Sequence, residues 1–360
     1  MEEVSRAFWK VDPIVRSMGG YLDVIGLTPV ETTLVHWTEH VFDINIGLLD
    51  ARDPDLNIKG IDLVISAGDA PNAAARQSGD RRAVIISLGL LRKLWRFLTA
   101  AAHHPDVLSR AHPLRDPGKS WKEALDGPLI AFDDWSMEAE RAEYFVDILM
   151  QMFDYVITHE LAHLLRRHID LLFPDATPGF VDEAATYLDQ APGRSPELLP
   201  ETLQDIEFDA DANGLNQMLL SMDEKHPFLR GWTAEDGLEY GFQLAFAHIL
   251  VMRALDTREG PVDRPGTEYP SPLFRAMNFT NLVFRSLHDL VPCDFEESVR
   301  VHDTAWFEAS EISKDIGFGD GRWFGEGPSD ADHEKFLVRE ARYFEATRRI
   351  DRILDGADNG

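Results

Sequence analysis

Two histidines and a glutamate stand at a spacing that suits metal chemistry: His159, Glu160 and His163 form the pattern His-Glu-x-x-His. Residues four apart lie on the same face of an α-helix, so two imidazoles at this spacing can bind one metal ion without distorting the backbone. A carboxylate next to the first histidine would lie beside that ion, where it can take a proton from a bound water. The pattern therefore predicts two metal ligands and a general base, Glu160.

The residues around this pattern are apolar, as they are in a helix that crosses a hydrophobic core. They are Val156, Ile157, Leu161, Ala162, Leu164 and Leu165. Two histidines and a glutamate buried there without a metal would be costly to satisfy by hydrogen bonding. The context therefore favours a metal site over a chance occurrence of the three residues.

A zinc ion with an open position for water needs three protein ligands, and the pattern supplies two of them. Downstream, Glu207 and Asp211 are again four residues apart and would share a helical face. One carboxylate can bind the metal while the other accepts the N–H of a ligating imidazole. Glu183, twenty residues after His163, is the alternative third ligand, at a separation seen in thermolysin-like enzymes. We favour Glu207, because only Glu207 has an aspartate one turn later on the same face.

Two other metallohydrolase patterns do not fit the sequence. A metzincin has a glycine break and a third histidine six residues after the second, whereas His168 follows His163 by five and Arg166 replaces the glycine. We expect His168 to be a structural residue further along the same helix. Peptide deformylase needs a cysteine ligand upstream of the helix, and the only cysteine, Cys293, lies downstream.

The two motifs, His159-Glu-Leu-Ala-His163 and Glu207-Phe-Asp-Ala-Asp211, resemble those of the gluzincin branch of zinc metallopeptidases. They are closest to the CAAX-processing and heat-shock metallopeptidases, and are similar also to the phage-exclusion (Lit-like) peptidases. The resemblance covers about residues 140–275. It implies a Zn²⁺ cofactor held by His159, His163 and Glu207, and a protein or peptide substrate. Members embedded in membranes carry transmembrane helices that are not predicted here, so the resemblance implies a soluble relative.

Residues after the third ligand add a further candidate element. The membrane-embedded families often place a His-Pro pair and a later arginine there, and the stretch from Tyr269 to Arg275 has the same rhythm with tyrosine in place of histidine. A phenol can donate a hydrogen bond to a developing oxyanion. The resemblance therefore makes Tyr269 and Arg275 candidates for the site. A proline-restrained turn with a packed tyrosine is the alternative interpretation.

The composition excludes several classes of partner. The chain has 360 residues and a net charge of −28, from 35 Lys and Arg against 63 Asp and Glu, which disfavours nucleic acid and anionic membranes as partners. One cysteine excludes an internal disulfide and is typical of a reducing cytosol. The first residues lack the pattern of a signal peptide, and the most apolar window, 241–252, is too short to cross a bilayer. We therefore expect a cytoplasmic protein without nucleic-acid or membrane partners.

The pattern of apolar residues predicts an α+β fold that is predominantly helical. Strands are expected at 61–66 and 82–88, with a loop between them and a helix at 90–102. A long helix, or two with a kink, should run from about 136 to 172 and carry the metal motif. Residues 1–50 give no clear element. Further helices are expected at 201–222, 235–256, 272–290, 294–314 and 331–354.

These elements predict a region with a small β-sheet over residues 1–130 and a helical metal-binding region over 131–360, packed as one compact unit. The resemblance implies a zincin-like core, in which a strand above the motif helix pairs with an extended substrate. The strand at 82–88 is the candidate for that strand.

The sequence thus predicts a zinc-dependent peptidase in which Glu160 acts as general base toward a metal-activated water. Two other interpretations stay open. One is a non-catalytic helical interaction protein with a structural or vestigial metal site. The other is a regulatory protease that a partner activates. The substrate and the oligomeric state are open as well.

Overall fold

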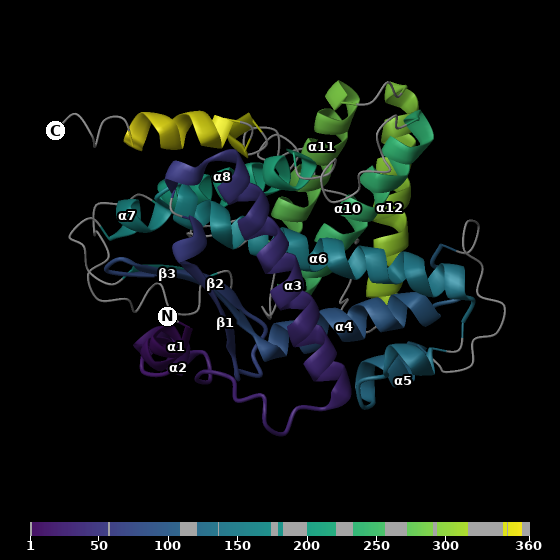
Figure 1. Ribbon diagram of the computed structural model, residues 1–360. Helices are drawn as coiled ribbons and strands as arrows, with labels where there is room; N and C mark the ends of the chain where they lie inside the picture. Colours follow the sequence, from purple (N-terminus) through teal and green to yellow (C-terminus); the bar gives the residue numbers. More distant parts are fainter. Residues whose placement is uncertain are drawn as a thin grey trace.

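The long helix α6 (Ala139–Leu165) runs through the middle of the molecule, with α8 (Pro200–Leu220) above it and a small sheet below it in Figure 1. Within the described residues the fold is predominantly helical with one sheet, as the sequence predicts. The computed structural model describes residues 2–56, 58–108, 121–135, 137–173, 179–182, 200–220, 233–255, 272–290, 294–315, 341–343 and 345–354.

The helices predicted in the described part are confirmed, with ends that differ by a few residues. Besides α6 and α8 they are α4 (Leu88–His103), α10 (Ala234–Leu255), α11 (Pro272–Leu290) and α12 (Phe295–Asp315). The helix expected at 331–354 lies partly outside the described residues, of which 341–343 and 345–354 are helical. Short elements that the sequence does not predict are α5 (Trp121–Asp126) and the 3-10 helices Pro54–Leu56, Ile58–Gly60 and Phe132–Asp134.

The sheet has the strand order β1-β3-β2-β4. β1 runs parallel to β3, and β2 runs antiparallel to both β3 and β4. The predicted strands are confirmed as β1 and β3, but β2 lies where the sequence suggests a loop, because its alanines and polar residues have a low strand propensity. The strands are β1 (Ile61–Ser66), β2 (Ala73–Ser78), β3 (Arg81–Ser87) and β4 (Gly179–Asp182).

β3 cannot be the substrate-pairing strand that the sequence suggests. It lies inside the sheet, where Val84 pairs with Leu63 of β1 on one side and with Ala75 of β2 on the other. An extended peptide adds only to a strand with a free edge. The assignment of residues 82–88 to this role is therefore wrong, and the outer strands of the sheet are β1 and β4.

The longest element that the sequence does not reveal is α3 (Pro29–Arg52). Its first turn is capped in both directions, because Thr28 Oγ1 accepts from the Glu31 N–H while the Glu31 carboxylate accepts from the Thr28 N–H at 2.7 Å. Its buried face includes the polar side chains of Thr38 and Asn45. These two residues interrupt the kind of apolar pattern that marks the other helices in the sequence.

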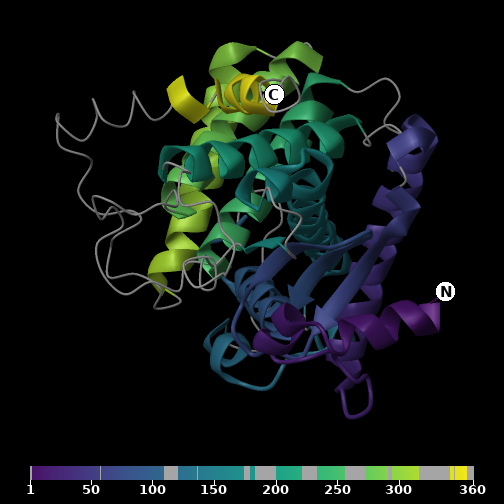
Figure 2. The same ribbon diagram turned by 90° about the vertical axis from the view of Figure 1, so that its left-hand side faces the viewer.

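Two short N-terminal helices, α1 (Glu2–Trp9) and α2 (Pro13–Ser17), cover the face of the sheet that points away from the helical body (Figure 2). Asp12, the N-cap of α2, forms a buried ion pair of 2.9 Å with Arg76 of β2. Arg76 also donates to the Gly179 carbonyl of β4 at 2.9 Å. The start of the chain is thereby fastened to two strands of the sheet.

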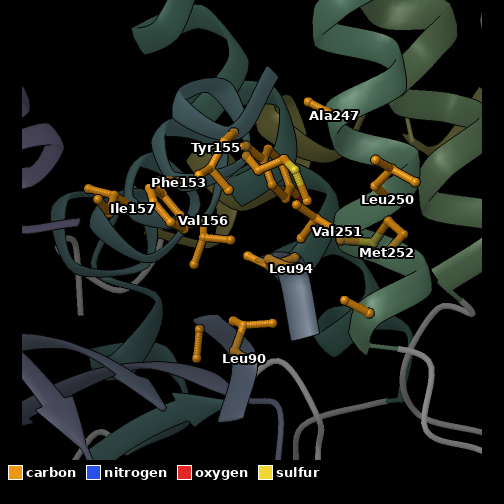
Figure 3. Close-up of a cluster of buried hydrophobic side chains, with 14 of the residues drawn as sticks. Leu90, Leu94, Phe153, Tyr155, Val156, Ile157, Ala247, Leu250, Val251 and Met252 are labelled. Carbon is orange, nitrogen blue, oxygen red and sulfur yellow. The ribbon is translucent and has the colours of Figure 1, made fainter. Parts of the chain in front are cut away.

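One main hydrophobic core joins the regions on both sides of residue 130. In Figure 3 the side chains of Leu94 on α4, Val156 on α6 and Val251 on α10 lie close together. Burying a side chain of this size stabilises the fold by about 1.5–3 kcal/mol. α6 is thus held by packing along its length, which fixes the residues that it carries. None of the described helices is both long enough and apolar enough to cross a membrane.

The region predicted as one long helix, or two with a kink, is divided into two helices. α6 stops at Leu165, Arg167 adopts the left-handed conformation with φ +58°, and a second helix, α7 (His168–Leu172), begins. This conformation is uncommon for a residue with a side chain, and it turns the chain sharply. His168 therefore does not lie further along the motif helix, as the sequence suggests, but begins a separate helix.

Candidate metal centre

α6 places His159 and His163 one turn apart, and their rings meet edge to face. Their Nε2 atoms are 3.0 Å apart, and both side chains are buried. Glu160, between them on the same helix, is buried as well. The neighbouring apolar residues Ile157 and Leu161 belong to the main core, so the packing of the helix fixes where these polar groups lie.

α8 crosses α6 and brings the predicted third ligand to the two histidines. Glu207 Oε2 lies 3.5 Å from His159 Nε2, and Glu207 Oε1 lies 3.8 Å from His163 Nε2. The helices approach closely at Gly214, where a Cβ atom would lie 3.2 Å from the backbone nitrogen of His159. Since a side chain there would push the helices apart, this glycine helps to set how near Glu207 comes.

His159, His163 and Glu207 form a buried group that could hold a metal ion, with donor atoms within 4.8 Å of one another. Two ligands on a tetrahedral zinc, with bonds of about 2.0–2.1 Å, lie about 3.3 Å apart. The two Nε2 atoms, 3.0 Å apart, and the pair of His159 Nε2 and Glu207 Oε2, 3.5 Å apart, lie just below and just above that distance. Two imidazoles and a carboxylate are also a donor set that zinc accepts. In the described part of the chain, no other such group of three or more His, Cys, Asp or Glu side chains is found.

Asp211 lies one helical turn after Glu207 and beside His159. This is the position that the four-residue spacing of Glu207 and Asp211 predicts. Its Oδ1 is 3.1 Å from His159 Nδ1, so the carboxylate can accept the N–H and leave Nε2 for a metal. Burial by itself would raise the pKa of Asp211, but the charge of Arg275 and the hydrogen bond from His159 hold it well below its usual range. Asp211 is therefore ionised at neutral pH.

Arg275, on α11, reaches into the same group. Its Nη1 lies 3.2 Å from Glu207 Oε2, and its Nη2 lies 2.7 Å from Asp211 Oδ1. One buried guanidinium thus binds two buried carboxyl groups, and Glu160 adds a third buried carboxyl group to the centre. With the carboxyl groups ionised and the imidazoles neutral, the centre keeps a net negative charge that a divalent cation would balance.

Two predicted residues, the alternative ligand Glu183 and the candidate donor Tyr269, lie outside the described residues. A different tyrosine takes part in the centre. Tyr155, one turn before His159 on α6, donates to Asp211 Oδ1 at 2.7 Å and accepts from Arg275 Nη2 at 3.0 Å. Its spacing of four residues from His159 is the signal by which the sequence could have revealed it.

His168 has a contact that its spacing does not reveal. Its Nδ1 lies 2.9 Å from His163 Nδ1, and its Nε2 lies 2.8 Å from Asp209 Oδ2 on α8. Burial lowers the pKa of His168 and outweighs the opposite effect of Asp209, so the ring is neutral at pH 7. Burial also opposes ionisation of Asp209, but hydrogen bonds from His168 and Arg166 hold the pKa of Asp209 at about 2. The Asp209 carboxylate thus supports His163 through the intervening ring of His168.

The centre is closed to solvent in this structure. His159, Glu160, His163 and Glu207 are each no more than 1% exposed. A peptide cannot reach donor atoms covered in this way unless the surrounding structure changes. Comparison of the chain with protein-family models, curated proteins and solved structures found no significant match.

Proposed function

We propose that this protein is a zinc-dependent peptidase of the gluzincin type, with His159, His163 and Glu207 as zinc ligands and Glu160 as general base. The observation that carries the proposal is the convergence of two imidazole Nε2 atoms and one carboxylate, with a glutamate next to the first histidine on the same helix. Zinc-binding histidines usually donate their second N–H to a carboxylate or carbonyl, and His159 faces Asp211 in this way.

The chemistry is divided between the metal and the chain. Bound zinc would act as a Lewis acid, polarising the scissile carbonyl and lowering the pKa of the attacking water. Glu160 would accept a proton from that water and pass it to the leaving amine. Because Glu160 lies on a packed helix directly after a ligand, its carboxylate is held in a constant position relative to the reacting atoms.

Neighbouring residues would keep the ligands in place during this reaction. Asp211 orients His159, while Arg275 binds the carboxylates of both Asp211 and Glu207. Tyr155 donates to Asp211 and so leaves that carboxylate fewer ways to rotate. None of these three residues needs to exchange a proton with the substrate.

Of the interpretations that the sequence leaves unresolved, the burial of the centre favours a protease whose active site a partner or the substrate must first uncover. All four principal residues are covered, so the structure represents a closed state with respect to peptides. A structural metal site would be equally buried. The two differ at Glu160, because a structural site has no need of a general base.

The test begins with metal content. Purified wild-type protein should carry about one zinc per chain, and His163→Ala should lose most of it, because only two protein ligands remain. Glu160→Gln should fold and keep its zinc, since the amide preserves the shape of the side chain. Hydrolysis by Glu160→Gln should fall by at least about 10²–10⁴-fold, because an amide cannot accept the proton.

The activity assay has to allow for a closed site. Proteins from a cell lysate that are captured on Glu160→Gln are offered to the wild type, and cleavage is followed by mass spectrometry. Wild-type protein that takes up no zinc would reject the proposal. So would a Glu160→Gln variant that cleaves an identified substrate as fast as the wild type, even with zinc bound.

A further inference from the structure

The break between α6 and α7 turns the chain so that His168 meets the second ligand. Arg167, in the left-handed conformation, ends one helix and starts the next, and the His168 ring then lies edge to face with that of His163. Their Nδ1 atoms are 2.9 Å apart. His168 is fully buried, so no water competes for this contact.

The positions of the hydrogens follow from the geometry. A histidine that binds a metal through Nε2 carries its hydrogen on Nδ1, so His163 donates from Nδ1 and His168 Nδ1 must accept. The remaining nitrogen of His168, Nε2, then carries a hydrogen and donates to Asp209 Oδ2 at 2.8 Å. If His168 were protonated on Nδ1 instead, two N–H groups would face each other at hydrogen-bond distance.

The far end of this chain of hydrogen bonds is held firmly. The Asp209 carboxylate is fully buried and accepts from Arg166 Nε and from Asn213 Nδ2, each at 2.9 Å. Arg166 in turn binds Asp351 at 2.5 Å. Asp209 is thereby prevented from rotating away from His168. The two ligating histidines thus differ in their support: His159 meets a carboxylate directly, and His163 meets one through a second imidazole.

We propose that His168 and Asp209 are positioning residues that fix the tautomer and ring orientation of His163, and through it the affinity of the centre for metal. The inference rests on the proposed zinc site. Mutation of a residue that hydrogen-bonds to a metal ligand typically weakens metal binding by about 10–100-fold. His168→Phe keeps a ring of similar size but removes both nitrogens, so it should weaken zinc binding by about 10–100-fold.

Zinc affinity of the full chain is measured by competition with a chromogenic chelator. His168→Asn is the conservative variant, because its side-chain oxygen can still accept from His163 Nδ1, and its zinc Kd should fall between those of the wild type and His168→Phe. Leu172→Ala is the matched control: this residue is buried on the same short helix, but its side chain is apolar and belongs to the main hydrophobic core. It should lower the melting temperature and leave the zinc Kd unchanged. A His168→Phe variant that binds zinc as tightly as the wild type would overturn the inference and leave the zinc site intact.

A second measurement does not depend on zinc. Long-range ¹H–¹⁵N correlation spectra of protein labelled at histidine report which ring nitrogen carries the hydrogen. In the metal-free protein, the His168 signals, identified by their absence in His168→Phe, should show a neutral ring protonated on Nε2. A His168 ring protonated on Nδ1 would overturn the inference. Wild-type protein that takes up no zinc would reject the proposed function instead, and the spectra would still decide the state of His168.

Discussion

At the level of single residues, each of the two histidines has one orientation that its neighbours support. Nδ1 of His159 faces Asp211, and Nδ1 of His163 faces His168, so the two Nε2 atoms are left facing each other at 3.0 Å. Two nitrogen lone pairs at that distance repel unless a cation or a proton lies between them. The outer hydrogen bonds therefore hold the rings in the arrangement that a bound cation needs.

The identity of the third ligand can be tested at the same scale. Glu207→Ala leaves two protein ligands and should weaken zinc binding more than Asp211→Asn or Glu183→Ala does. Asp211→Asn should cost less, about 10–100-fold in affinity, because Asp211 supports His159 and is not itself a proposed ligand. Glu183→Ala should have little effect. All three are compared by isothermal titration with zinc, and a larger loss in Glu183→Ala than in Glu207→Ala would move the third ligand to residue 183.

At the level of the elements, the four-residue spacing within each motif explains why the sequence could reveal the proposed ligands. His159 and His163, like Glu207 and Asp211, are four residues apart, so helical periodicity alone brings each pair to one face. The resemblance made Arg275 a candidate, but its contacts with both carboxylates depend on how α11 packs against α8, which no local pattern contains. The role of His168 was hidden for a related reason, because the left-handed Arg167 turns the chain and nothing in an arginine predicts this.

The sheet and the first fifty residues illustrate a different limit. β2 becomes a strand by pairing with β3 and β4, and its own residues have little tendency to do so. α3 is a helix whose buried face contains polar residues, so its periodicity is weak. Its capping box, from Thr28 to Glu31, was present in the sequence as a signal. Local patterns thus identify elements whose apolar faces are continuous, and miss those that tertiary contacts complete.

The start of α3 gives a prediction that depends on pH. Burial alone would raise the pKa of Glu31, but hydrogen bonds from Thr28 and the Arg92 guanidinium lower it below its ordinary value of 4.5. The charge of Glu31 therefore stabilises the fold fully above that ordinary value, and the contribution is lost as the pH falls through the lowered pKa. Glu31→Gln should reduce the free energy of unfolding by about 1 kcal/mol at pH 7.

Urea denaturation at several pH values checks this expectation. The difference between Glu31→Gln and the wild type should shrink as the pH falls below about 4.5. Asp69→Asn is the control, because this carboxylate also binds Arg92 but is 89% exposed, and exposed ion pairs contribute little. A difference for Glu31→Gln that stays constant down to pH 3 would mean that the charge of Glu31 is not its source.

At the level of the whole molecule, residues far apart in the chain converge on the helix that carries Glu207. Arg342 and Arg349 both bind the Asp205 carboxylate, at 2.7 and 2.9 Å. Arg166, just after the motif, binds Asp351 near the end of the helical residues 345–354. The ligands are therefore held by contacts that reach across most of the chain, and we expect the centre to form late, when these distant segments have come together.

The closed centre also has a consequence for the time that a metal stays bound. If ligands that are no more than 1% exposed become reachable only when the structure opens locally, a chelator must wait for that opening. Zinc release should then be first order, with a rate that levels off as the chelator concentration rises. Stopped-flow mixing with increasing chelator measures that plateau, which equals the opening rate. A rate that keeps rising in proportion to chelator would show that the ion is reachable in the folded state. A partner that opens the centre would raise the plateau.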